Sequence, residues 1–179
     1  MNNIQEEGFE IFTKLISFFV FMGGDFMKGE YSAKDIAKWF LCAVDRDSGD
    51  SITHLKLQKL LYYAQAWSLV LLGKPMFYEK IQAWTHGPVV PEVYDEYSKY
   101  HYSEIPQPDE CPNLSKETED VLEQVMQIYG IYEAKYLERL THQEKPWKEA
   151  RGDLPLEARC ENTISLETMK NFYTEMQEA

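Results

Sequence analysis

Two short stretches of the sequence place a histidine directly after a threonine, with a tryptophan and a proline close by. One reads WTHGPVVPEVYDEY and contains His86, and the other reads THQEKPW and contains His142. Imidazoles are common metal ligands, so these histidines and an acid such as Glu144 would suit a metal-dependent hydrolase if they met in space. The alternative is that each histidine makes a hydrogen bond at a turn, and this is the role that we expect.

Other signatures of catalysis are missing from the chain. It contains no HExxH, CxxC or GxSxG motif and no glycine-rich phosphate loop. Its acidic runs are more typical of solvated helix faces than of paired catalytic carboxylates. We therefore expect no catalytic residue, no metal site and no cofactor, with a hydrolase that uses His86 and His142 as the alternative.

The first histidine stretch has the composition of a rigid connection. Residues 77–85 alternate imperfectly and predict a short strand, whereas Pro91 suits the first position of a helix, where its missing N–H costs nothing. Gly87 permits a close backbone approach, and proline stiffens the chain on either side. We expect a strand that turns into a helix, with His86 holding the junction by a hydrogen bond. The residues assigned to this structural motif are Trp84, His86, Gly87, Pro88, Pro91, Tyr94, His142 and Trp147.

Hydrophobic periodicity predicts the elements that position this motif. The longest segment follows Thr53, reads LKLQKLLYYAQAWSLVLLG and is apolar almost all round, as in a central, buried helix. The sequence therefore predicts a mainly α fold, a single compact helical domain of about six helices with one or two short β-strands near Ile81. Further helices are expected after Ser32, Pro91, Ser115 and Ser165 and around Tyr136.

Composition narrows the classes of partner. The chain has 179 residues, enough for one domain, and a net charge of −12 from 30 acidic and 18 basic residues. An acidic chain repels phosphate backbones, so we expect no direct nucleic-acid binding. Its surface instead suits basic protein partners.

The cysteines predict the redox compartment. Cys42, Cys111 and Cys160 show no paired spacing, and their odd number argues against a disulfide framework. Cys42 lies in an apolar helical pattern and is expected to behave as a small buried hydrophobe. We therefore expect a reducing, cytoplasmic location.

Residues 1–26 form an apolar extension before a domain at 27–179. Their segment IFTKLISFFVFM is interrupted by Lys14 and is shorter than the about 20 residues of a membrane span. Glutamates precede it where a secretory signal would be basic. We expect neither a transmembrane helix nor a signal peptide, and no contact with a membrane.

The apolar side chains of this extension need a partner. Phe12, Leu15, Ile16 and Phe19 recur at i, i+3, i+4 and i+7, and exposed patches of this kind associate. We expect them to bind a partner as a helix laid in a groove. The alternatives are packing on the chain's own domain, pairing with a second copy in a homo-oligomer, and a start site upstream of the true one.

The order of these motifs resembles the Panacea antitoxin domain, the SocA-like or phage-associated GepA-like family. The resemblance is carried by LKLQKLLYYAQAWSLVLLGKPMF, IQAWTHGPVVPEVYDEY, LERLTHQEKPWKEAR and ISLETMKNFY, and it covers roughly Tyr31 to Tyr173. The matching positions are Leu57, Lys59, Leu60, Tyr62, Ala64, Trp84, Gly87, Pro88, Val89, Tyr94, Thr141, His142 and Trp147.

The resemblance implies a function that composition alone does not. Family members are typically antitoxins of two-gene toxin–antitoxin pairs, often carried by prophages, and neutralise a cognate protein toxin by direct binding. One branch acts instead as an adaptor that delivers its toxin to an AAA+ protease, which makes that protease the alternative partner. No enzymatic activity and no cofactor are implied.

Overall fold

The computed structural model describes residues 31–178, which fold mainly into α-helices. The predicted class is confirmed, with seven α-helices in this part of the chain where about six were expected. The additional helix is α7, which the hydrophobic periodicity did not predict. The elements are α2 (Ala33–Ala43), α3 (His54–Leu71), β1 (Gln82–Trp84), β2 (Gly87–Val89), α4 (Pro91–Tyr97), the 3₁₀ helix η1 (Ser98–Tyr100), α5 (Lys116–Tyr129), α6 (Ala134–Thr141), α7 (Lys145–Arg151) and α8 (Leu166–Glu178).

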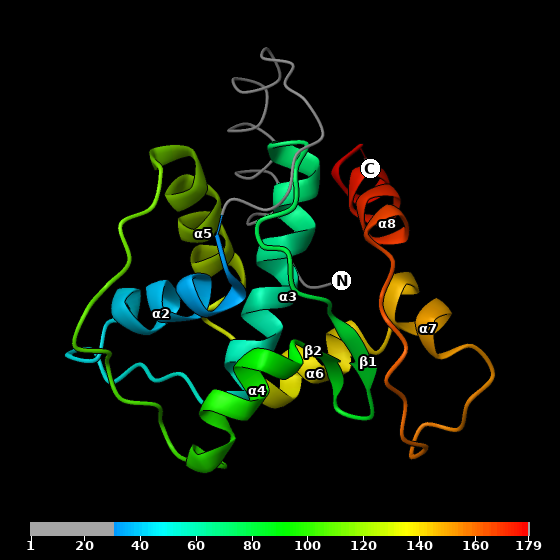
Figure 1. Cartoon of the computed structure of the whole chain (residues 1–179), viewed down its shortest axis with the longest axis horizontal. Coiled ribbons are helices and arrows are strands. Elements are labelled where there is room, and N and C mark those ends of the chain that lie inside the picture. The colour runs from blue at the N-terminus through cyan, green and yellow to red at the C-terminus, as the bar shows by residue number, and fades with distance from the viewer. Residues whose placement is uncertain (1–30, 179) are drawn as a thin grey trace.

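Helix α3 is the central element, as its apolar pattern predicted. It runs through the middle of the molecule, with α2 and α5 on one side, α8 on the other, and α4, α6 and the two strands near its N-terminal end (Figure 1). Thr53 caps it by accepting a hydrogen bond from the Lys56 amide at 3.4 Å. Because other elements cover nearly every face of α3, its polar side chains have to find partners inside the protein.

Two glutamines of α3 fix the chain that leaves it. The Oε1 atom of Gln65 accepts hydrogen bonds from the amides of Met76 at 2.8 Å and Phe77 at 3.1 Å. Gln58 lies earlier on the same helix, and its Oε1 accepts a hydrogen bond from the Val90 amide at 2.8 Å. A primary amide offers both donors and an acceptor, so each glutamine side chain can form hydrogen bonds to the backbone in the way that a neighbouring β-strand would. The segment between these anchors is therefore folded back along α3.

The sequence predicted one or two short strands near Ile81, and the structure has two, the first of them shorter than the predicted range. Only Gln82–Trp84 of residues 77–85 is a strand, and Gly87 begins a second strand instead of a direct turn into a helix. The two pair antiparallel, with Gln82 opposite Val89. The backbone of residues 162–164 also joins β1, because the Ala83 amide donates to the Asn162 carbonyl at 2.9 Å. That neighbour comes from the far end of the chain, so local alternation could not reveal it.

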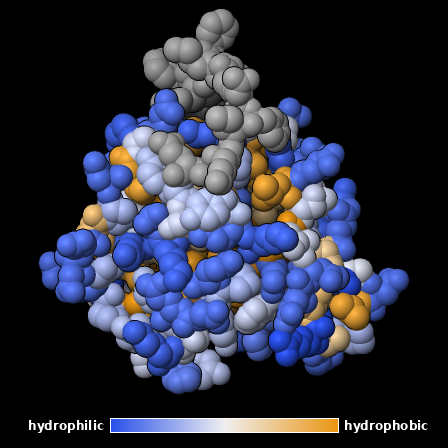
Figure 2. Space-filling model, in the orientation of Figure 1, coloured by the Kyte–Doolittle hydropathy of each residue, from blue (hydrophilic) through white to orange (hydrophobic). Residues whose placement is uncertain are grey.

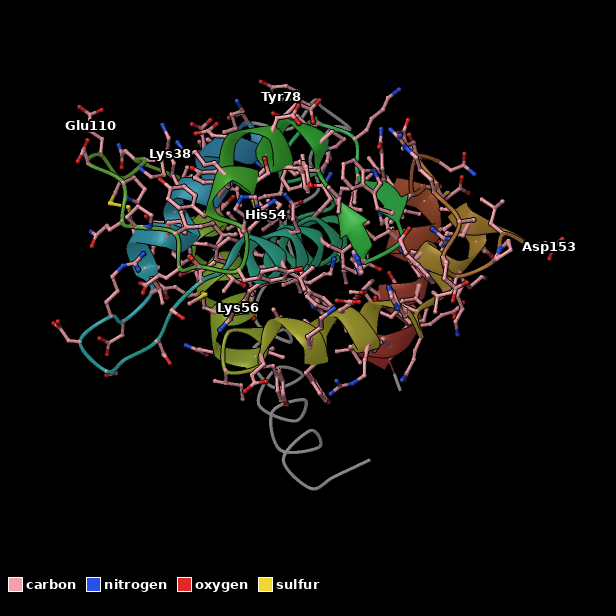
Figure 3. The ribbon with its side chains drawn as sticks, turned by 90° about the horizontal axis from the view of Figure 1, so that it is seen from below. Lys38, His54, Lys56, Tyr78, Glu110 and Asp153 are labelled. Carbon is pink, nitrogen blue, oxygen red and sulfur yellow. A yellow bond between two sulfur atoms is a disulfide. The ribbon has the colours of Figure 1, made fainter. Side chains whose placement is uncertain are left out.

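The prediction about the cysteines is wrong for Cys42. It forms a disulfide with Cys111, 69 residues away, and is half-buried instead of being an isolated buried hydrophobe. Only Cys160 is free and buried. An odd count does not prevent one pair from forming, and sequence spacing says nothing of a contact made in space. The bond ties the end of α2 to the loop of residues 101–114, where Glu110 marks one end of the molecule (Figure 3).

No helix between residues 31 and 178 combines the length and the apolar character that a membrane span requires.

We predict that Cys42→Ser lowers the free energy of unfolding by about 2–5 kcal/mol under oxidising conditions, because the cross-link restricts the unfolded chain. Cys160→Ser is the matched control and should change stability much less. Urea denaturation with and without reductant measures both. The interpretation fails if Cys42→Ser and wild type unfold at the same midpoint without reductant.

Candidate functional site

His86 lies at the tip of the β1–β2 hairpin and contacts helix α6. Its side chain is 69% exposed, and its Nδ1 lies 3.2 Å from Oε1 of Glu138. The other carboxylate oxygen of Glu138 accepts a hydrogen bond from Lys135 at 2.7 Å. Burial by itself would raise the pKa of Glu138, but the hydrogen bonds from Lys135 and His86 outweigh it and hold that pKa below its usual value. Glu138 is thus an ionised, largely buried carboxylate that is shared by two hydrogen-bond donors.

A buried lysine lies beneath the hairpin. Lys59 has no exposed surface, and its Nζ donates to the Pro88 carbonyl at 3.1 Å. Burial lowers the pKa of Lys59 to about 7, and the nearby charge of Glu138 acts in the opposite direction. Lys59 was expected as a position that matches the family pattern but was not assigned to the structural motif. The available signal was a lysine in the middle of a helix whose residues are mostly apolar.

Gly87 is required by both its conformation and its neighbours. Its φ is +95°, a region that L side chains rarely adopt, and a Cβ at this position would lie 2.8 Å from Nζ of Lys59. The same Cβ would lie 2.9 Å from Oγ1 of Thr141 on α6. The close backbone approach predicted for Gly87 is therefore an approach to Lys59 and Thr141.

His142 belongs to a different set of contacts. Its ring stacks on Trp147, with centroids 4.2 Å apart and planes 22° apart. Trp147 in turn donates from Nε1 to the Trp84 carbonyl at 3.1 Å. Burial lowers the pKa of His142, and its Nε2 has no hydrogen-bond partner among the described residues. The stacked pair therefore fastens α7 to the hairpin by packing and by one hydrogen bond.

Glu144 is enclosed by three tyrosine hydroxyls. Tyr62 and Tyr173 donate to its Oε2, each at 2.8 Å, and Tyr63 donates to its Oε1 at 3.1 Å. Burial raises the pKa of Glu144 to about 7, although all three hydroxyls favour the charged form. This cluster joins the segment between α6 and α7 to both α3 and α8.

The three residues considered as metal ligands engage separate partners. His86 faces Glu138, His142 stacks on Trp147, and Glu144 is held by tyrosines. Across residues 31–178, no three His, Cys, Asp or Glu side chains are grouped so that they could hold a metal ion. The arrangement gives no support to the hydrolase alternative.

The remaining motif residues build the entry to α4. Pro91 occupies the first turn of α4, as predicted. Tyr94 lies between two rings, with its centroid 4.7 Å from that of His54 and 4.8 Å from that of Trp84. Burial lowers the pKa of His54 to about 4, so this histidine is a neutral packing residue at physiological pH. The row of rings fixes α4 against the hairpin.

Residues 57–148 match the sequence model of a family described as Antitoxin SocA-like, Panacea domain, and this is more than half of the chain. The chain belongs to this family. The match runs from α3 into α7, so the Panacea domain of this protein contains the hairpin, Lys59, Glu138 and Glu144. The resemblance expected from Tyr31 to Tyr173 is wider than the match, which leaves α2 and α8 outside. No curated protein and no solved structure matches the chain.

In this Panacea domain, several side chains of the matched region support the β1–β2 hairpin. Side chains of α3, α6 and α7 contact the hairpin, and His86 is the one residue of the structural motif that is largely exposed. Such an arrangement holds the backbone of the hairpin in place. The role of His86 as a junction residue stays a prediction.

We predict that Gly87→Val destabilises the Panacea domain more than His86→Ala does. The first change adds backbone strain of about 1–3 kcal/mol, before any clash with Lys59 is counted. The second removes one hydrogen bond of a largely exposed side chain, about 0.5–1.5 kcal/mol at most. Thermal melts compare them, with Gly73→Val as the matched control, because Gly73 also has a positive φ but no atom within 4 Å of its Cβ position. If His86→Ala keeps the native melting temperature but loses function, His86 is a functional residue and not only a structural one.

We predict opposite pH effects from Glu144 and Lys59. Between pH 4.5 and about 7 the native state binds more protons at Glu144 than the unfolded state does, so this group makes stability fall as pH rises. Between about 7 and 10.5 the unfolded state binds more protons at Lys59, so stability rises with pH. Denaturation profiles of Glu144→Gln and Lys59→Met, each subtracted from wild type, isolate the two contributions. Flat difference profiles would contradict the assigned shifts.

Proposed function

We propose that this Panacea-domain protein is the antitoxin of a two-gene toxin–antitoxin pair and neutralises its cognate toxin by direct protein–protein binding. The observation that carries the proposal is the family match over residues 57–148. The contacts that support the hairpin favour this proposal, because a surface that is already ordered loses little conformational entropy on binding. The net charge of −12 favours a basic partner through electrostatic complementarity.

We further propose that neutralisation involves no catalysis. The polar groups of the hairpin region that most resemble catalytic residues already have structural partners, since Glu144 binds three tyrosines and His142 packs on Trp147. Their shifted pKa values follow mainly from burial, which also occurs at structural positions.

The proposed site of action is the cytoplasm. That compartment keeps thiols reduced, so the protein would act there with Cys42 and Cys111 as a dithiol. The cross-link is then a property of the oxidised protein and not a requirement for binding.

We predict that co-expression of this protein with the product of the adjacent gene restores growth that the adjacent product alone arrests, and that the two chains co-purify. Toxin abundance is measured in the same cultures. A stable toxin held in a complex is the expected result. Toxin that disappears only when an AAA+ protease is present would point to the adaptor role, whereas a harmless neighbour, or rescue without a complex, would refute direct neutralisation.

The apolar extension is proposed to contribute to toxin binding. Phe12, Leu15, Ile16 and Phe19 lie outside the described residues, so this proposal rests on their periodicity. The division into an extension at 1–26 and a domain at 27–179 is likewise proposed from the sequence.

We predict that a chain without residues 1–26 keeps the melting behaviour of the full chain but no longer rescues growth. Circular dichroism and the co-expression assay measure the two properties. A truncated protein that folds and still neutralises would show the extension to be dispensable. Unfolding of the truncated protein would assign the segment to the core.

A further inference from the structure

The loop that follows α7 carries exposed leucines. We call residues 152–160 the Arg151 loop, after the residue that precedes and supports them. Leu154 is 44% exposed and Leu156 is 52% exposed, and Pro155 between them is also exposed. Figure 2 shows hydrophobic surface at the lower right of the molecule, over this loop. The loop lies outside the residues that match the Panacea family.

Arg151 holds the Arg151 loop in a fixed conformation. Its side chain is buried, and Nη1 donates to the Ala83 carbonyl of β1 at 3.0 Å. Nη2 donates to three loop carbonyls, those of Pro155 at 2.7 Å, Leu156 at 3.1 Å and Ala158 at 2.8 Å. A buried guanidinium needs acceptors for its N–H groups, and here the loop backbone supplies them. The exposed leucines are therefore presented on an ordered backbone.

Three further contacts reinforce this order. The Ala158 amide donates to the Pro155 carbonyl at 3.0 Å, which closes a turn within the loop. Thr85 of the hairpin donates from its hydroxyl to the Ala158 carbonyl at 3.3 Å. The guanidinium of Arg151 also lies 5.0 Å from the ring centroid of Trp147. The loop is thus fastened to the same hairpin that the family motif braces.

An ordered apolar loop differs from an ordinary exposed leucine. Single exposed hydrophobic side chains are common and need no explanation. Here two leucines are separated by one proline, and a buried arginine fixes their backbone. They form a preorganised surface, which loses little conformational entropy when a partner covers it. These features favour binding to another protein.

Charges around the leucines define the chemistry of that partner. Asp153 and Glu157 flank them, both are exposed, and neither forms an ion pair with any described residue. Asp153 lies at the edge of the molecule opposite Glu110 (Figure 3). The nearby Arg159 is already paired with Glu161. The surface is therefore an apolar centre with an acidic rim, which complements an apolar patch rimmed by lysine or arginine.

We propose that the Arg151 loop is a docking surface for a protein that presents an apolar patch with a basic rim. This inference rests on the function proposed above, and the partner it assigns is the toxin. Leu154 and Leu156 enter the apolar patch, while Asp153 and Glu157 pair with the basic rim.

The test uses the full-length chain and the purified product of the adjacent gene. The Leu154→Ser/Leu156→Ser double variant should weaken the dissociation constant at least about tenfold, as expected when anchors at the centre of an interface are lost. Asp153→Lys/Glu157→Lys should slow association and reduce its dependence on salt. Ile131→Ser is the matched control, because Ile131 is 67% exposed in the turn between α5 and α6. It should bind as wild type, and all variants should keep the wild-type melting temperature.

Hydrogen exchange of the wild-type complex provides a readout without mutation, and amides of residues 152–160 should become more protected. If wild type binds but the leucine variant binds within about twofold of it, without added protection of the loop, the docking surface is refuted and the antitoxin proposal stands. If wild type forms no complex at all, both the antitoxin proposal and this inference fail. Self-association of wild type that the leucine variant abolishes would assign the surface to a second copy of the chain and overturn the toxin assignment.

Discussion

The fold depends on one constraint, which is that the polar side chains on the buried helix α3 must find hydrogen-bond partners inside the protein. Gln58, Lys59 and Gln65 satisfy it by bonding to backbone groups of the chain that follows α3. Leaving such a group buried and unpaired costs about 1–3 kcal/mol, so each bond strongly favours one path for that chain. The position of the hairpin, and the need for glycine at position 87, are consequences of this requirement.

The same helix connects the matched family region to the C-terminal helix. Tyr62 and Tyr63 of α3 and Tyr173 of α8 share Glu144, and Tyr63 also stacks on Tyr129 of α5 at 3.7 Å between centroids. Removing one hydroxyl would leave part of a buried carboxylate unsatisfied, so the cluster makes three helices interdependent.

Local signals in the sequence were sufficient for the parts of the fold that depend on neighbouring residues. The central helix, its cap at Thr53 and the helix start at Pro91 follow from periodicity and capping chemistry. The disulfide of Cys42, the pairing of β1 with residues 162–164 and the tyrosines around Glu144 were not predicted, because each requires segments distant in sequence to meet. In the candidate site, the sequence indicated the stiff turn around Gly87. It did not indicate that Lys59 is buried under that turn, because a lysine on an apolar helix can also extend to solvent.

We propose that the protein acts by binding its toxin and not by modifying it. Titration of the purified full-length protein into a fixed amount of active toxin, with toxin activity as the readout, tests this claim most directly. We expect toxin activity to fall in proportion to the complex formed, to reach zero at a fixed stoichiometric ratio, and to return when the complex is dissociated. Complete inactivation by a small fraction of an equivalent, or toxin that stays inactive after separation, would contradict it and indicate catalysis.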